Sequence, residues 1–355
     1  MNLKKGFIYV FFSNMLTLLI SMITGFVLPK ILSIDTYSSI KLFQLYITYV
    51  GILHFGFSDG MLLKYGGKEI KKINSEEIKA EFKTFKCFQF VVTIFCILLS
   101  LIFKNAILFY CSLVILPINV GNYLRNLYQA TGRFDSYAKF TNLNTLFIFF
   151  VNLFLLFIIK TDNASFYILG YVLFYFIYWF FLELEMYHLF GKNNSSFNLK
   201  YLFQNVKSGF FLMIGNFCNV IFTGIDRLFV QNLLGVIEFA YYSFAVSIEN
   251  LLNTFISPLT TIMYNYFCNN TKSYDVKRVK RIVLILGGAL ISTVFIIKGL
   301  VELFLDKYVS SLSVLYILFA AQYFSFIVKC VHLNLFKAKK LQNIYFIIML
   351  FIIIL

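Results

Sequence analysis

Charged residues are scarce in this sequence, and their scarcity excludes a soluble fold. Only 13% of the 355 residues are charged, whereas 60% are hydrophobic. Soluble domains carry about 25% charged residues, and a chain of this composition would expose a large apolar surface to water. We therefore expect the chain to lie in a lipid bilayer.

The features of a catalytic centre are also missing from the sequence. It has no Gly-rich phosphate loop, no Cys/His cluster and no Asp-x-Asp pair in an outer loop. The six cysteines have neither close pairing nor metal-ligand spacing, which favours a role as small apolar side chains. Glu183, Glu185 and His188 cluster, but the Glu-x-x-His of a two-metal site occurs only once. We interpret them as a solvated helix end and predict no enzymatic activity, metal or cofactor.

The sequence contains instead a series of long apolar runs. A helix needs about 20 apolar residues to cross a bilayer, and backbone groups in lipid must be paired within a helix or a closed barrel. The runs are too long for barrel strands, so they predict helices. They cover residues 6–28, 39–57, 88–103, 106–123, 140–159, 165–184, 208–234, 237–263, 282–301 and 308–328. An eleventh run begins near Ile344 and reaches Leu355, which predicts an all-α multi-pass membrane protein truncated in its eleventh helix.

Lysine and arginine are concentrated in every second gap between the apolar runs, and this bias predicts the orientation of the chain in the membrane. Of the 31 basic residues, 24 lie in the N-terminal segment and in every second gap. The remaining seven are Lys30, Lys41, Lys104, Lys160, Arg227, Lys298 and Lys307. Cytoplasmic loops are rich in Lys and Arg, so the N-terminus is expected in the cytoplasm and the first run is interpreted as an uncleaved helix. The net charge of +15 then reflects topology and attraction to anionic lipid, not nucleic-acid binding.

Two polar stripes coincide when the chain is shifted by 202 residues. Asn14, Thr17, Ser21 and Thr24 then fall on Asn216, Asn219, Thr223 and Asp226. Steps of 3, 4 and 3 residues place each set on one face of a helix. Such a stripe can serve hydrogen bonding between packed helices, but the matching register favours a shared polar cavity. The sequence therefore predicts a six-helix bundle over residues 1–190, a cytoplasmic linker at 191–207 and an incomplete second bundle over 208–355.

Ionisable residues within the apolar runs are candidate functional groups, because each is costly in lipid. Asp226 and Arg227 form either a charged lining of a vestibule or an interfacial pair that reaches water. Glu249 lies near the middle of its run, on the same face as Asn253, which favours a functional role. His54 is interpreted as a hydrogen-bonded packing residue in preference to a proton relay.

Three segments resemble a known transporter family. Residues 56–68 (GFSDGMLLKYGGK) are similar to the segment that closes the second helix of Wzx-type polysaccharide flippases, members of the multidrug/oligosaccharidyl-lipid/polysaccharide superfamily. Residues 125–133 (RNLYQATGR) resemble the counterpart after the fourth helix. Residues 224–258, with GIDR, LG, AYYS and SP in order, resemble the seventh and eighth helices. With the helix count and topology, the resemblance covers nearly the whole chain.

The resemblance implies two related six-helix bundles around a central cavity that opens alternately to each side. Its cargo would be an oligosaccharide linked by pyrophosphate to a polyprenyl lipid, moved to the outer leaflet of the bacterial inner membrane. Polymerases and glycosyltransferases of the same pathway would be partners. Arg227 is the first candidate for the pyrophosphate, followed by Lys30 and Arg125. Asp226 and Glu249 are candidates for coupling to a proton or ion.

Other functional classes stay open at this point. A drug or cation antiporter of the same superfamily would share the fold, and the segment that closes the second helix argues against it. A membrane glycan polymerase should carry a long outer loop with acidic or Arg/His groups, which the sequence does not contain. A structural scaffold would not require matched polar stripes or a carboxylate within a run.

Overall fold

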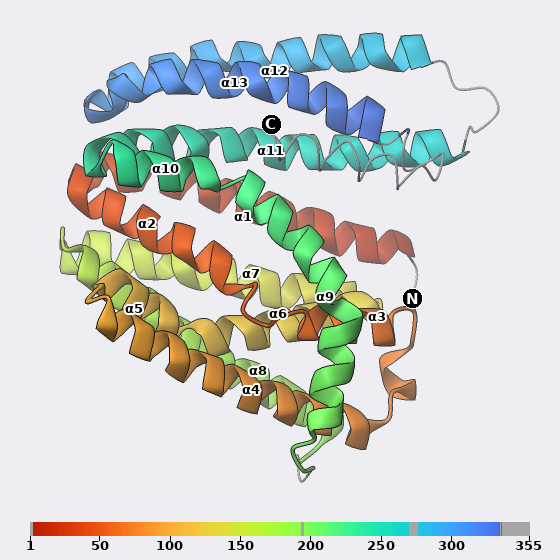
Figure 1. The fold of residues 1–355 in the computed structure, drawn as a ribbon. Coiled ribbons are helices and arrows are strands. Elements are labelled where there is room, and N and C mark those ends of the chain that lie inside the picture. The colour runs from red at the N-terminus through yellow and green to blue at the C-terminus, as the bar shows by residue number, and fades with distance from the viewer. Residues whose placement is uncertain (1–2, 193–194, 270–275, 334, 336–355) are drawn as a thin grey trace. The chain divides into compact units, whose positions relative to one another are not determined.

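The computed structural model describes residues 3–192, 195–269, 276–333 and 335 (Figure 1). This part of the chain contains helices and no strand, as the sequence predicts. The first helices are α1 (Leu3–Ile31), α2 (Ile34–Val50), α3 (Phe57–Tyr65), α4 (Ser75–Ile102), α5 (Ala106–Leu113), α6 (Ile115–Ala130) and α7 (Phe134–Leu153). They are followed by α8 (Ala164–Phe190), α9 (Leu199–Phe222), α10 (Ile225–Leu233), α11 (Val236–Asn269), α12 (Val276–Phe304) and α13 (Leu312–Ile327). Short 3₁₀ segments cover Ile70–Lys72 and Asp306–Ser311, and π-helical turns cover Phe154–Ile159 and Val328–Leu333.

Several of these helices are long and apolar enough to cross a membrane. They lie at Phe12–Ile31, Ser75–Ile102, Phe134–Ile159, Ala164–Phe190, Val279–Phe304 and Asp306–His332. The pair α5 and α6, bent by 42°, would add a seventh span. On α4, Phe95 and Ile102 are 60% and 72% exposed, an apolar surface suited to lipid. The described residues thus form a helical protein with the features of a multi-pass membrane protein.

Three predicted apolar runs are interrupted in the structure. The run at 39–57 is not one helix, because α2 ends at Val50 and α3 starts only at Phe57. Phe55 and Gly56 between them are left-handed, with φ of 50° and 86°. The run at 208–234 breaks between Phe222 and Ile225, and the run at 106–123 bends at Val114. Hydropathy alone does not reveal such breaks, because apolar turn residues leave the run continuous. The predicted eleventh run lies outside the described residues.

Asparagine side chains cap several helix starts. Asn74 Oδ1 accepts hydrogen bonds from the backbone N–H groups of Glu76 and Glu77 at the start of α4, at 3.0 and 3.4 Å. The acidic side chains of Glu76 and Glu77 lie at the positive end of the helix dipole. Asn105 and Asn163 cap α5 and α8 in the same way. These caps satisfy amide groups that a helix end otherwise leaves unpaired.

The chain divides into two compact units, each described by itself. The first unit comprises Met1–Ile20 and Asp35–Asp226, and the second comprises Ser21–Ile34 and Arg227–Leu355. The helix α9 therefore belongs to the first unit, where it packs against α3 (Figure 1). In the second unit α12 and α11 both pack along α13. The predicted division into a bundle over residues 1–190, a linker over 191–207 and a second bundle from residue 208 stays a prediction.

Aromatic side chains form the core of the first unit. The rings of Phe57, Phe85 and Tyr123 join α3, α4 and α6, with centroids 4.9 Å apart for Phe57 and Phe85 and 5.2 Å for Phe85 and Tyr123. All three side chains are fully buried. Aromatic pairs at such distances stabilise beyond their buried area. This cluster fixes the short helix α3 against the two long helices.

An ion pair between a buried carboxylate and a half-buried lysine lies beside this core. Lys64 Nζ donates to Glu77 Oε1 at 2.7 Å and also to Glu81, whose side chain is fully buried. Tyr65 OH donates to the other oxygen of Glu81 at 2.8 Å. Burial alone would lower the pKa of Lys64, but the hydrogen bonds and charges of Glu77 and Glu81 outweigh it and raise that pKa. Burial, followed by the charge of Glu81, raises the pKa of Tyr65.

Replacing Lys64 by methionine is expected to destabilise the protein by about 3 kcal/mol, because it leaves the Glu81 carboxylate buried without a cation. Thermal unfolding in detergent micelles measures the effect. The matched control is Lys72→Met, since Lys72 pairs with Glu69 at 3.2 Å with both side chains at least 70% exposed. Such a surface pair contributes less than about 1 kcal/mol. Equal unfolding temperatures for the two variants would contradict a larger contribution of the Lys64–Glu81 pair to stability.

Candidate functional site

The structure contains two adjoining polar cavities in the first unit. Their volumes are about 240 and 340 Å³, and they share Thr48, Gly51, Asn122 and Arg125 as lining residues. The smaller cavity is also lined by Ile47, Ile118, Gly121, Thr141, Asn144, Tyr175 and Tyr178. The larger is also lined by Ile52, His54, Asp59, Asn126, Gln129, Tyr137, Met213, Asn216 and Val220. We name the two together the Arg125 cavity.

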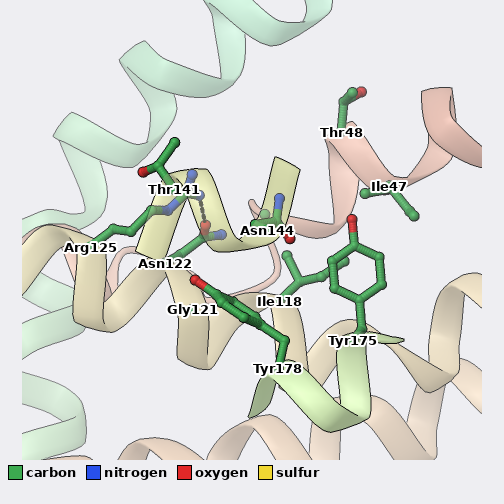
Figure 2. A pocket seen from close by; sticks show the side chains of 11 residues that line it. Ile47, Thr48, Ile118, Gly121, Asn122, Arg125, Thr141, Asn144, Tyr175 and Tyr178 are labelled. Carbon is green, nitrogen blue, oxygen red and sulfur yellow. Dashed lines mark hydrogen bonds between the residues drawn. The ribbon is translucent and has the colours of Figure 1, made fainter. Parts of the chain in front are cut away.

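The residues around the Arg125 cavity come from six helices and the turn after α2. Figure 2 shows Arg125 and Asn122 on α6, Tyr175 and Tyr178 on α8, and Thr48 on α2 around the smaller part. Helices α3 and α9 contribute Asp59 and Asn216 to the larger part, and α7 lines both parts. Amides, hydroxyls and tyrosine rings thus surround one guanidinium group.

Arg125 is the charged centre of this cavity and is half-buried. Its guanidinium group donates a hydrogen bond to Asn122 Oδ1, one turn earlier on α6 (Figure 2). A guanidinium group carries five N–H donors, so one bond to Asn122 leaves donors for a bound anion. This arrangement suits phosphate or carboxylate groups, which arginine binds in a planar, two-pronged geometry.

An acid and a base lie on another wall of the cavity. His54 Nε2 is 3.7 Å from Asp59 Oδ2, and both side chains are buried. His54 Nδ1 accepts the backbone N–H of Gly56 at 3.0 Å, which agrees with the predicted hydrogen-bonded packing role. Asn216 Nδ2 donates to Asp59 Oδ1 at 3.3 Å. Asp59 Oδ2 accepts no hydrogen bond from the described residues.

Among the stripe side chains that the structure describes, Asn216 is the one that lines this cavity. Asn14 is exposed, and Thr17 donates within its own helix to Ser13 O at 3.0 Å. The hydroxyl of Ser13 instead reaches α7, where it donates to Asn142 Oδ1 at 2.5 Å. Thr223 is exposed and donates to Val220 O at 3.2 Å. The side chain of Asn219 lies outside the described part.

The other predicted candidates lie away from the described cavity lining. Asp226 and Arg227 are half-buried in the first turn of α10, after the break at Gly224. In the second unit, Lys30 lies 5.1 Å from the ring centroid of Phe304. These positions define no anion site among the described residues. Arg125, the last of the three predicted cationic candidates, lines both parts of the cavity.

Glu249 belongs to a polar cluster inside the second unit. Its carboxylate accepts a hydrogen bond from Gln322 on α13. One turn along α11, Asn253 Oδ1 accepts from Lys329 Nζ at 3.3 Å. The predicted face of Glu249 and Asn253 is therefore directed at α13 and at the π-helical turn that follows it. A carboxylate and an ammonium group held among helices in this way are candidates for ion coupling.

The two glutamates at the end of α8 bond to neighbouring helices. Glu183 Oε2 accepts from Lys86 Nζ at 2.8 Å, and Glu185 Oε1 accepts from Tyr128 OH at 2.7 Å. His188 is exposed. Across the described residues there is no group of three metal-binding side chains. The carboxylates instead tie α8 to α4 and α6.

Sequence reasoning missed most of the cavity lining, although a signal was present. Asn119, Asn122, Asn126 and Gln129 follow one another along α6 in steps of 3, 4 and 3 residues. The stripes at residues 14–24 and 216–226 have the same spacing. Asn122, Asn126 and Gln129 all line the cavity. The α6 stripe has no copy at a shift of 202 residues, so a search for repeats does not find it.

The fold and the cavity indicate a class: a helical protein with the features of a multi-pass membrane protein and a polar cavity between its helices. No family model, curated protein or solved structure matches the chain.

Proposed function

We propose that this protein is a flippase for lipid-linked oligosaccharides. Its substrate would be a polyprenyl-pyrophosphate-linked repeat unit, moved from the inner to the outer leaflet of the bacterial inner membrane. The observation that carries the proposal is the Arg125 cavity, an amide-rich space with a guanidinium group within a bundle of apolar helices. The bias of basic residues toward alternate gaps supports a cytoplasmic N-terminus.

The chemistry of the cavity suits both polar parts of such a substrate. Pyrophosphate requires a fixed cation with several donors, which Arg125 supplies. Sugar hydroxyls both donate and accept hydrogen bonds, as do the amides of Asn122, Asn144 and Asn216. Tyrosine rings offer a flat apolar face with a polar edge. The polyprenyl tail can remain in the bilayer, because the outward-facing helix surfaces are apolar.

Two of the segments that carry the family resemblance contribute to this cavity. The segment 56–68 forms α3 and provides Asp59. The segment 125–133 provides Arg125, Asn126 and Gln129. Their place beside one cavity supports a common role in substrate handling.

Reconstitution into phospholipid vesicles tests the proposal. A polyprenyl-pyrophosphate oligosaccharide with a fluorescent label is placed in both leaflets, and a membrane-impermeant quencher reports the label that becomes accessible. Vesicles with the protein should expose label faster than protein-free vesicles. A labelled polyprenyl lipid without pyrophosphate and sugar should become accessible at the same rate in vesicles with the protein and in protein-free vesicles. Equal rates for the full substrate would refute the flippase.

One observation favours the alternative of an organic-cation antiporter. Asp59 is buried at the cavity and its Oδ2 atom accepts no hydrogen bond from the described residues, so it could hold a cation. Binding of tetraphenylphosphonium to the purified protein distinguishes the two functions. An antiporter should bind this cation, and the Asp59→Asn variant should not. A flippase should bind pyrophosphate instead.

Coupling to an ion is expected to depend on Glu249. The variant Glu249→Gln removes the charge beside Gln322 while keeping the shape, and should slow flipping driven by an ion gradient by about tenfold or more. Glu238→Gln is the matched control, since Glu238 is exposed in the first turn of the same helix. Asp226→Asn tests the second predicted coupling residue in the same assay. Full activity in Glu249→Gln and Asp226→Asn would exclude both carboxylates from coupling.

A further inference from the structure

Side-chain amides from two helices hold the end of α2, where the chain turns toward α3. Asn119 on α6 donates from Nδ2 to Val50 O at 3.3 Å. Gln89 on α4 donates from Nε2 to Leu53 O at 3.1 Å. Both side chains are fully buried. Buried amides that bond backbone carbonyls at a helix break fix the path of the chain there.

The same amides continue as a chain of hydrogen bonds to Arg125. Asn119 Nδ2 also donates to Gln89 Oε1 at 2.7 Å, so its two hydrogens serve two acceptors. Asn122 Nδ2 donates to Asn119 Oδ1 at 3.4 Å. Asn122 Oδ1 in turn accepts from the guanidinium group of Arg125. We name Gln89, Asn119 and Asn122 the amide network.

This connection joins two walls of the cavity. One end of the amide network holds the turn that carries His54 and leads into Asp59, and the other end holds Arg125. Each amide uses its donor and its acceptor in a fixed direction, which sets the orientation of the next group. A purely structural role would need the bonds to Val50 and Leu53 but not the extension through Asn122.

We propose that the amide network is a positioning device that orients Arg125 toward an anionic pyrophosphate group in the cavity, an inference that rests on the proposed function. Gln89 and Asn119 do not line the cavity and act through Asn122. Sites of high affinity need this kind of support, because a misplaced side chain loses bonds even when it is present.

A double-mutant cycle on the full-length protein in phospholipid nanodiscs tests the proposal, with inorganic pyrophosphate as the probe. Gln89→Ala, Asn119→Ala and Asn122→Ala should each weaken binding by about five- to tenfold. In the Arg125→Gln background the same changes should weaken binding no further. Thr93→Ala is the matched control for Gln89, since Thr93 is a buried polar residue one turn along α4 whose hydroxyl bonds no described residue.

The outcomes separate the inference from the proposed function. If Arg125→Gln weakens binding but the amide variants bind like the wild type, the inference is overturned and the anion site stands. Equal losses in both backgrounds, or an equal loss in Thr93→Ala, would show a general structural effect and also overturn it. If Arg125→Gln itself binds like the wild type, the anion site fails and the inference falls with it. Asn122 is only half-buried, so Asn122→Ala keeps the test valid if the fully buried positions do not tolerate alanine.

Discussion

Replacing Arg125 by glutamine is expected to weaken pyrophosphate binding by about 10- to 100-fold, the loss of one or two charge-assisted hydrogen bonds. Flipping of the pyrophosphate-linked substrate should fall in parallel. Glutamine keeps a polar but shorter side chain in the cavity, so the change removes the charge together with the planar pair of donors. Isothermal titration in nanodiscs measures binding, and the vesicle quenching assay measures transport.

Two further variants make this test specific. Arg125→Lys keeps the charge but loses the planar pair of donors, so its binding should be intermediate. Arg133→Gln is the matched control, because Arg133 follows the same helix but lies 5.5 Å from the ring centroid of Tyr128 and does not line the cavity. Wild-type binding in Arg125→Gln, or an equal loss in Arg133→Gln, would exclude Arg125 as the anion site.

Alanine at Gly209 is expected to prevent correct packing of the first unit. A Cβ atom there would lie 2.1 Å from Gly56 O and 2.2 Å from Gly60 N, which are backbone atoms that cannot rotate away. Alanine at Gly60 would meet Asn205 O at 2.0 Å from the other side. Close helix packing in membranes depends on such small residues. The helices α3 and α9 would have to separate, at a cost above about 3 kcal/mol.

The measurement is the yield of monodisperse protein in detergent and its unfolding temperature. Gly215→Ala is the matched control on the same helix, because a Cβ atom there has no neighbour within 4 Å. Alanine at Gly215 should leave the protein unchanged or raise its stability by up to about 1 kcal/mol. If Gly209→Ala folds as well as Gly215→Ala, the close contact between α3 and α9 is wrong.

The polar site was only partly predictable from sequence. Asn216 and Arg125 were both selected as candidates, and both line the cavity. His54 was interpreted as a packing residue, and its bond to the N–H of Gly56 agrees with that. What the sequence did not reveal is that Asp59 lies 3.7 Å from it. That proximity depends on the turn between α2 and α3, where Gly56 adopts a left-handed conformation that apolar periodicity does not encode.

Hydropathy predicts an all-helical protein, which the described residues confirm, because long apolar runs in lipid must form helices to satisfy their backbone groups. The bias of basic residues also predicts an orientation that awaits measurement. The breaks in the runs, the polar stripe that faces the cavity and the cation that lines it follow from helix packing and are not evident from hydropathy. These features depend on contacts between distant segments, such as the bonds from amides of α4 and α6 to the end of α2 and the turn that follows it. Local composition constrains a helix, but the neighbours of that helix determine which of its faces is functional.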